Sequence, residues 1–120
     1  MAETVLLVED DPSLRRLAER VLAKLGYDVV VAAGAESALV LGRDLRKAID
    51  LLITDVFMPN VGGAELAQQL STLRPGLRVL YISGSSETQM DRVLTPGANF
   101  LQKPFTTEEL SKKIREILDR

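Results

Sequence analysis

Short apolar runs alternate with longer segments of mixed character along the whole chain. The apolar runs cover residues 5–8, 29–31, 51–53, 79–82 and 100–101. Continuous apolar runs are typical of β-strands that are covered on both faces, because every side chain of such a strand meets a core. We therefore predict five buried strands at these positions.

The first segment between two runs repeats its apolar residues with the period of an α-helix. These residues are Leu14, Leu17, Ala18, Val21, Leu22 and Leu25. Such spacing forms one apolar stripe on a helix. Asp11 is suited to cap this helix, Pro12 to occupy its first turn and Gly26 to end it.

Four further helices are expected after the remaining strands. They span residues 35–47, 63–73 and 87–94, with a last helix that carries Leu110, Ile114, Ile117 and Leu118. Pro75 and Gly76 end the third helix of the chain, because neither residue favours its continuation. Thr106, with Glu109 three residues later, forms the pattern of a capping box at the start of the last helix.

Five successive strand–helix units predict an α/β fold in which helices cover both faces of a parallel sheet. Right-handed crossovers allow few arrangements of such units. We predict a flavodoxin-like, doubly wound sheet with strand order 2-1-3-4-5 and five helices, formed by residues 1–120 as a single domain. In that order the functional crevice lies at the carboxyl ends of the first and third strands.

Composition excludes several classes of site. The 120 residues include 15 basic and 17 acidic side chains, a net charge of −2, which argues against the basic surface that direct nucleic-acid binding requires. The absence of cysteine and histidine excludes thiolate and imidazole metal sites within this chain. No apolar run approaches the roughly 20 residues of a membrane helix. We expect a cytoplasmic chain without a membrane segment.

Polar side chains follow four of the predicted strands at the point where each strand ends. They are Glu9, Asp10 and Asp11 after the first strand, Asp55 after the third, Ser83 and Gly84 after the fourth, and Lys103 and Pro104 after the fifth. Parallel strands present their carboxyl ends at one edge of a sheet, so these residues are expected to converge. Taken one by one, each is explained as a helix cap, a turn residue or a surface lysine; their joint placement points to a site.

The converging residues match the needs of phosphoryl transfer. Glu9, Asp10 and Asp55 would repel one another without a cation, and carboxylate oxygens with open water positions suit Mg²⁺. Lys103 adds a mobile positive charge, and the Ser83 hydroxyl is able to bond a phosphoryl oxygen. Asp55 is the predicted nucleophile, and its product would be an acyl phosphate.

These segments resemble the receiver domains of bacterial response regulators over essentially the whole chain. The matching stretches are LLVEDD at 6–11, LITDVFMP at 52–59, GG at 62–63, VLYISG at 79–84 and FLQKPF at 100–105. The resemblance implies that Asp55 is phosphorylated. It also implies that Asp10, Asp55 and the backbone carbonyl of Phe57 bind Mg²⁺ directly. Glu9 is implied to act on the metal through a water molecule.

The resemblance also implies roles around the pocket. Ser83 corresponds to the family's switch hydroxyl residue, Lys103 to its lysine beside the phosphoryl group, and Phe100 to its switch aromatic. Pro104 is implied to follow a cis peptide bond. The stretch from Ser83 to Phe100 is shorter than the usual family spacing, so the fourth helix is expected to be truncated or displaced.

Residues 58–67, 74–84 and 100–106 look most like receivers at the C-terminus of hybrid sensor histidine kinases. On that basis the chain takes its phosphoryl group from a sensor histidine kinase or its phosphohistidine domain. A full-length parent would itself be such a kinase, whereas this chain alone is not expected to be a turnover enzyme. A free-standing single-domain regulator and a weak homodimer stay open.

Other interpretations of the first polar cluster are weaker. Glu9 and Asp11 faintly resemble the Asp-x-Asp motif of haloacid-dehalogenase phosphatases, but Glu9 stands at the nucleophile position and Pro12 where that family has Gly-Thr. A flavin-binding flavodoxin is disfavoured because three consecutive acidic residues would repel phosphate. A DNA-binding regulator would need an output domain in addition to these residues.

Overall fold

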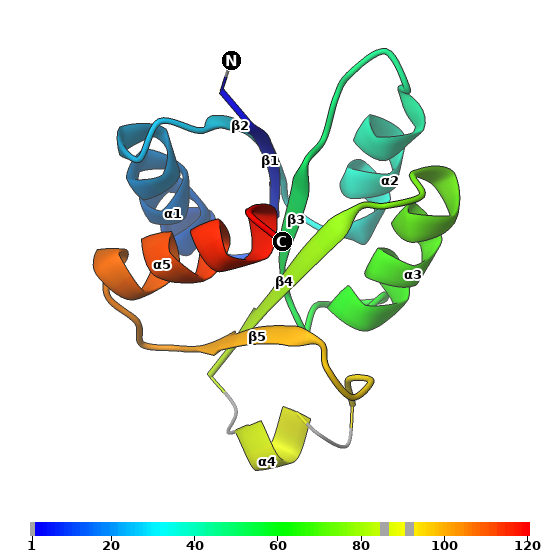
Figure 1. The fold of residues 1–120 in the computed structure, drawn as a ribbon. Helices are drawn as coiled ribbons and strands as arrows, with labels where there is room; N and C mark the ends of the chain where they lie inside the picture. The colour runs from blue at the N-terminus through cyan, green and yellow to red at the C-terminus, as the bar shows by residue number, and fades with distance from the viewer. Residues whose placement is uncertain (1, 85–86, 91–92) are drawn as a thin grey trace.

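The computed structural model describes residues 2–84, 87–90 and 93–120, and its centre is a five-stranded parallel sheet (Figure 1). The strands are β1 (Thr4–Val8), β2 (Asp28–Ala32), β3 (Leu51–Asp55), β4 (Arg78–Ser83) and β5 (Asn99–Gln102). Their order, β2-β1-β3-β4-β5, confirms the predicted topology. Every neighbouring pair is parallel, so the carboxyl ends of the strands meet at one edge.

Helices cover both faces of this sheet. They are α1 (Pro12–Lys24), α2 (Ala35–Arg43), α3 (Gly63–Leu73), α4 (Glu87–Met90) and α5 (Thr107–Leu118). Helices α1 and α5 lie on one face and α2 and α3 on the other, whereas α4 lies beyond the carboxyl ends of the strands (Figure 1). Within the described residues, every helix is too short or too polar to cross a bilayer.

Alternation along the central strands divides most of the core into two layers. On β1, Val5 and Leu7 belong to the layer under α1 and α5, and Leu6 to the layer under α2 and α3. This division follows from the two-residue period of a strand. The side chains of β2 and β5 are largely half-buried, because each is an edge strand with a single neighbour. The prediction of five buried strands is therefore wrong for these two.

The helix starts predicted from local residues are confirmed. Asp11 caps α1, where its Oδ1 accepts a hydrogen bond from the Ser13 amide at 2.8 Å. At α5 the Glu109 amide donates to the Thr106 hydroxyl, and the Thr106 amide donates to the Glu109 carboxylate, both at 3.0 Å. These bonds satisfy amides that have no partner within the helix.

Helix α2 ends at Arg43 instead of at residue 47 as predicted. The Asp44 side chain accepts a hydrogen bond from the Arg46 amide at 3.2 Å, and such a local bond favours a turn over a further helical residue. Arg74, which follows α3, donates from Nε to the Gly42 carbonyl at 3.0 Å and so occupies an acceptor at the helix end. The helix therefore stops where side chains replace its next backbone bonds.

The fourth helix is a single turn, in place of the predicted helix over 87–94. Helix α4 covers four residues, Glu87–Met90, and residues 91–92 of the predicted range lie outside the described part of the chain. The described residues thus hold four helices of nine residues or more and one short turn, so the prediction of five helices is wrong for the fourth. The expected shortening of this region agrees with the structure.

Candidate functional site

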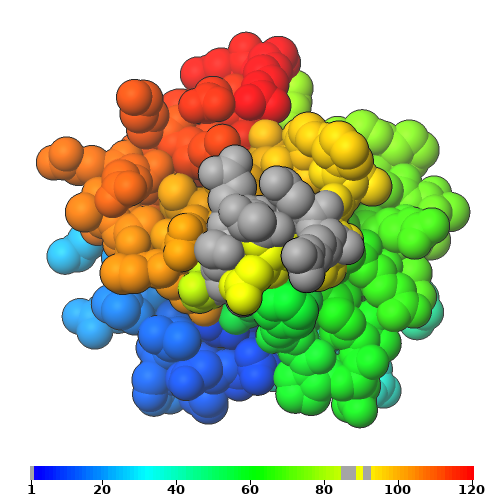
Figure 2. Space-filling view, turned by 90° about the horizontal axis from the view of Figure 1, so that it is seen from below, coloured from blue at the N-terminus to red at the C-terminus, as the bar shows by residue number. Residues whose placement is uncertain are grey.

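Three carboxylates from two neighbouring strands lie together at the carboxyl edge of the sheet. One oxygen atom each from Glu9, Asp10 and Asp55 lies within 4.8 Å of the other two. Glu9 and Asp10 follow β1, Asp55 ends β3, and these strands are paired. Figure 2 shows this side of the molecule, where the segment after β1 (blue), the loop after β3 (green) and the segment after β5 (orange) surround α4 (yellow).

The three carboxylates differ in their exposure to solvent. Glu9 is buried, with 3% of its surface exposed, Asp55 is half-buried, and Asp10 is exposed. A cluster of oxygen ligands with one open side fits Mg²⁺, which usually keeps several of its water molecules. The donor set of this chain therefore fits the metal that the sequence predicts.

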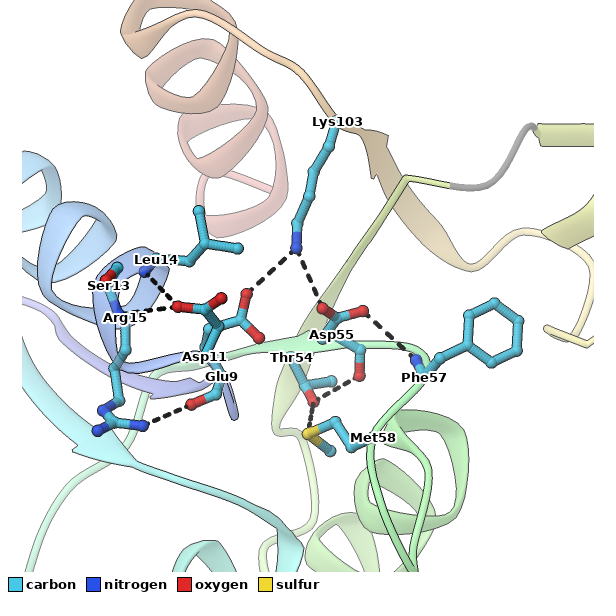
Figure 3. A network of polar contacts seen from close by, with 10 residues as sticks. All are labelled: Glu9, Asp11, Ser13, Leu14, Arg15, Thr54, Asp55, Phe57, Met58 and Lys103. Atoms are coloured by element: carbon cyan, nitrogen blue, oxygen red, sulfur yellow. Dashed lines mark hydrogen bonds and ion pairs between the residues drawn. The ribbon is translucent and has the colours of Figure 1, made fainter.

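Lys103 lies between the two less exposed carboxylates (Figure 3). Its Nζ donates to Glu9 Oε1 at 3.2 Å and to Asp55 Oδ2 at 3.0 Å. Burial alone would lower the pKa of Lys103, but the hydrogen bonds and charges of Asp55 and Glu9 outweigh it and raise that pKa. The lysine therefore stays protonated. The peptide bond that joins it to Pro104 is cis, the isomer that the resemblance implies.

Glu9 is the most buried acid of the cluster, and its surroundings act on it in opposite directions. Burial raises the pKa of the Glu9 carboxyl, whereas the positive charge of Lys103 lowers it and the nearby Asp55 raises it again. The net direction is upward. The cost of removing the Glu9 carboxylate from water therefore exceeds the stabilisation of its negative charge by Lys103.

The loop after β3 folds back over the predicted acceptor. The Phe57 amide donates to Asp55 Oδ1 at 3.4 Å, and the Phe57 ring points away from the carboxylate toward solvent (Figure 3). Asn60 has a φ of 70°, a left-handed conformation that Asn tolerates better than most residues. The loop thus returns the chain to α3 while keeping the main chain of Phe57 close to Asp55.

Ser83 and Phe100, the two predicted switch residues, lie on neighbouring strands. Ser83 is buried at the end of β4, and its carbonyl accepts a hydrogen bond from the Lys103 amide at 2.8 Å. Phe100 lies opposite Tyr81 in the β4–β5 pairing. Phe100 also packs against a small third core, here called the α4 cluster, which consists of Val56, Met90 and Leu94. Both residues are thus close to the segments that carry the candidate site.

Comparison with known proteins decides the family. Residues 5–115 match the response regulator receiver domain family. The chain belongs to this family. The crystal structure of the receiver domain from the hybrid histidine kinase CckA superposes on this receiver with a TM-score of 0.81 at 33% identity, covering 96% of this chain and 98% of the other. Vibrio cholerae CheY4 superposes with a TM-score of 0.86 at 28% identity, covering 98% and 100%.

Similar receivers occur in proteins of very different length. The sensor kinase CckA of Brucella abortus is 34% identical over 119 residues, which are 98% of this chain and 13% of that protein. The Arabidopsis thaliana regulator ARR14 is 32% identical over 97% of this chain, which spans 31% of ARR14. By contrast, the receiver protein CpdR of Brucella abortus is 33% identical over 95% of both chains. The receiver therefore spans a small part of some relatives and nearly all of another.

Arg15 and Thr54, to which the sequence assigned no role, bond the main chain that carries two of the receiver's clustered carboxylates. Arg15 on α1 donates from Nη1 to the Glu9 carbonyl at 2.9 Å, and the Glu9 amide donates to the Ala32 carbonyl at 3.2 Å. The main chain of Glu9 is thereby held on both sides. Thr54, fully buried beside Asp55, donates to the Asp55 carbonyl at 3.0 Å. A polar residue at the end of an apolar run was the available signal for Thr54, whereas no local pattern marks Arg15.

The structure explains why the family motif carries a glycine at position 63. Gly63 begins α3, and a Cβ atom added there would collide with the backbone oxygen of Asp55. Its amide donates to the Val56 carbonyl at 2.8 Å. The glycine therefore lets the first turn of α3 approach the end of β3 closely.

Proposed function

We propose that this receiver domain accepts a phosphoryl group on Asp55 from a phosphohistidine. A carboxylate oxygen of Asp55 attacks the phosphorus, the P–N bond breaks, and its electron pair stays on the imidazole nitrogen while an acyl phosphate forms. The donor is a sensor histidine kinase or its phosphohistidine domain. The observation that supports this most is the placement of Lys103 and two further carboxylates around Asp55.

Asp10, Asp55 and the Phe57 carbonyl would hold Mg²⁺, with Glu9 acting through a water molecule. When bound, the ion supplies positive charge to the phosphoryl oxygens. The residues of the chain do the rest: Lys103 is able to turn from its carboxylate partners to a phosphoryl oxygen, and Ser83 supplies a hydroxyl at the end of the neighbouring strand. The negative charge of the transferred phosphoryl group would thus be stabilised by the ion, by Lys103 and by the Ser83 hydroxyl.

The proposed output is a change of a partner-binding surface formed by α4, β5 and α5. Phosphorylation adds about −1.5 to −2 charges and strong acceptor oxygens at Asp55. Drawing Ser83 toward them would vacate space near β5, into which Phe100 turns. The packing of Phe100 on the α4 cluster supports this movement, because that cluster includes Val56, the residue that follows Asp55.

The receiver is proposed to be a single cytoplasmic domain of a hybrid sensor histidine kinase. The similarity to CckA supports this, since the related segment is 13% of that kinase. A free-standing regulator is favoured instead by the similarity to CpdR, which the receiver spans almost completely. The sequence on either side of this receiver in its genome distinguishes the two, because a hybrid kinase requires a kinase core upstream.

The acceptor is tested by intact mass spectrometry. Incubation with acetyl phosphate and Mg²⁺ should add one phosphoryl group to the wild-type chain and none to Asp55→Asn, because the amide cannot attack phosphorus as the carboxylate does. Asp28→Asn, which changes an exposed aspartate on β2, is the matched control and should be labelled like the wild type. Equal labelling of Asp55→Asn and the wild type would contradict the proposal.

A further inference from the structure

Thr54 places a hydroxyl group in an apolar layer of the core. The residue has 0% of its surface exposed, and in the sheet it lies between Val8 of β1 and Tyr81 of β4. By the alternation of β3 it shares a face with Leu52, which packs with α2 and α3. A buried hydroxyl is unfavourable unless it finds a hydrogen-bond partner. The hydrogen-bond partner of the Thr54 hydroxyl therefore indicates what this buried residue stabilises.

The Thr54 hydroxyl contacts the loop of the candidate site at two points. It donates to the Asp55 carbonyl at 3.0 Å, and it lies 4.0 Å from the sulfur of Met58 (Figure 3). Asp55 ends β3, and Met58 lies three residues later, beyond Phe57. One buried side chain thus contacts both the start of the loop and a residue further along it.

The Asp55 carbonyl is confined from the other side by α3. A Cβ atom on Gly63 would collide with this same oxygen, and the Gly63 amide donates to the Val56 carbonyl at 2.8 Å. The main chain at Asp55 and Val56 is therefore enclosed between the Thr54 hydroxyl and the first residue of α3. A substitution at Thr54 would therefore change the position of Asp55 directly, because the two residues are adjacent in the chain.

We propose that Thr54 is a positioning residue for phosphoryl transfer. Its hydroxyl fixes the main chain of Asp55 and the loop to Met58, and so sets the position of the Asp55 carboxylate relative to Lys103 and the incoming phosphorus. Thr54 does not contact the phosphoryl group and acts through Asp55. The inference rests on the proposed function, because it concerns the rate of the reaction at Asp55.

Two substitutions separate the hydroxyl from the methyl group of Thr54. Thr54→Val keeps the shape and removes the donor, whereas Thr54→Ser keeps the donor and removes the methyl group. At saturating acetyl phosphate and Mg²⁺, the labelling rate of Thr54→Val should fall by about 10-fold to 100-fold, since misplacement of a reacting group by about 1 Å costs on that order. Thr54→Ser should label at close to the wild-type rate although its melting temperature falls. Rates that follow the melting temperatures of the two variants, or a wild-type rate in Thr54→Val, would overturn the proposal.

Amide hydrogen exchange gives a readout that does not need the reaction. The amides of residues 56–58 should exchange faster in Thr54→Val than in Thr54→Ser or the wild type, because the loop loses its buried donor. Unchanged exchange there would overturn the positioning role even if labelling slows. Failure of the wild type itself to be labelled at Asp55 would instead contradict the proposed function, while faster exchange in Thr54→Val would still show that Thr54 fixes this loop.

Discussion

Lys103 contacts two of the three clustered carboxylates, and this arrangement shapes the chemistry of the third. The lysine bonds Glu9 and Asp55 but not Asp10, which stays exposed. Breaking a buried pair leaves an uncompensated charge, which is costlier than losing the attraction alone. Because Asp10 is exposed and Lys103 pairs with the other two acids, the Asp10 carboxylate remains available to an external cation. The same cluster therefore contains two acids paired with a lysine of the protein and one acid that is open to a metal ion.

The two acids after β1 should contribute differently to metal binding. Asp10→Ala should weaken Mg²⁺ binding more than Glu9→Ala, because a direct ligand matters more than a group that acts through water. Loss of such an outer group costs about 10-fold to 100-fold in metal affinity, and Asp10→Ala should exceed the loss seen in Glu9→Ala. The dissociation constants are measured by NMR titration with MgCl₂, with Asp28→Ala as a control of equal charge change. Undiminished binding in Asp10→Ala would count against the proposed metal site.

At the scale of residues, the sequence predicted which side chains meet but not how they are supported. Glu9, Asp10 and Asp55 could be placed together because parallel strands end at one edge. The bond from Arg15 to the Glu9 carbonyl could not, since it depends on the angle at which α1 leaves β1. A hydrogen bond from a side chain to a main-chain carbonyl produces no pattern of apolar and polar residues from which it could be predicted.

At the scale of elements, α2 and α3 are joined by an arginine. Arg74, which follows α3, donates from Nε to the Gly42 carbonyl at 3.0 Å and from Nη2 to the Asp44 carbonyl at 2.8 Å. The carbonyls at a helix C-terminus lack partners within the helix and carry partial negative charge. A cation from the neighbouring helix therefore satisfies them and fixes the two helices against each other. The early end of α2 is part of this contact.

Removal of this guanidinium should destabilise the fold without affecting the reaction. Arg74→Met should lower the free energy of unfolding by about 1–3 kcal/mol, the range for hydrogen bonds to charged groups and for acceptors left without donors. Urea denaturation followed by circular dichroism measures the change. Arg46→Met is the control, because Arg46 is highly exposed and its ion pair with Asp44 should contribute little. Equal stability of the two variants would show that Arg74 does not hold α2 in this way.

Element boundaries were predictable where neighbouring residues set them. Asp11 and Thr106 cap their helices through bonds to residues two or three positions later, so the sequence contains the whole signal. The end of α2 was mispredicted because part of its cause lies at Arg74, about thirty residues away. The burial of β2 and β5 was overestimated because an apolar run does not reveal whether a strand has one neighbour or two.

At the scale of the whole molecule, the site and the proposed output surface share packing contacts. Val56 directly follows Asp55 and belongs to the α4 cluster together with Met90 and Leu94. Phe100 packs on this cluster from β5, and the Lys103 amide bonds the Ser83 carbonyl at the other end of that strand. A displacement at Asp55 therefore has two physical routes to β5. Such a route biases an equilibrium between two arrangements of the same fold.

Phosphorylation should consequently change residues well beyond the pocket, and Ser83 should be required for that change. In the wild type, amide NMR shifts on phosphorylation should extend to Phe100, Met90 and α5. Ser83→Ala should still accept a phosphoryl group, because Asp55, Lys103 and the proposed metal ligands remain, but its shifts should stay within the pocket loops. The exposed variant Ser71→Ala on α3 should behave like the wild type. Wild-type shifts confined to the pocket loops, with α4, β5 and α5 unchanged, would show that this receiver does not signal through Ser83 and Phe100.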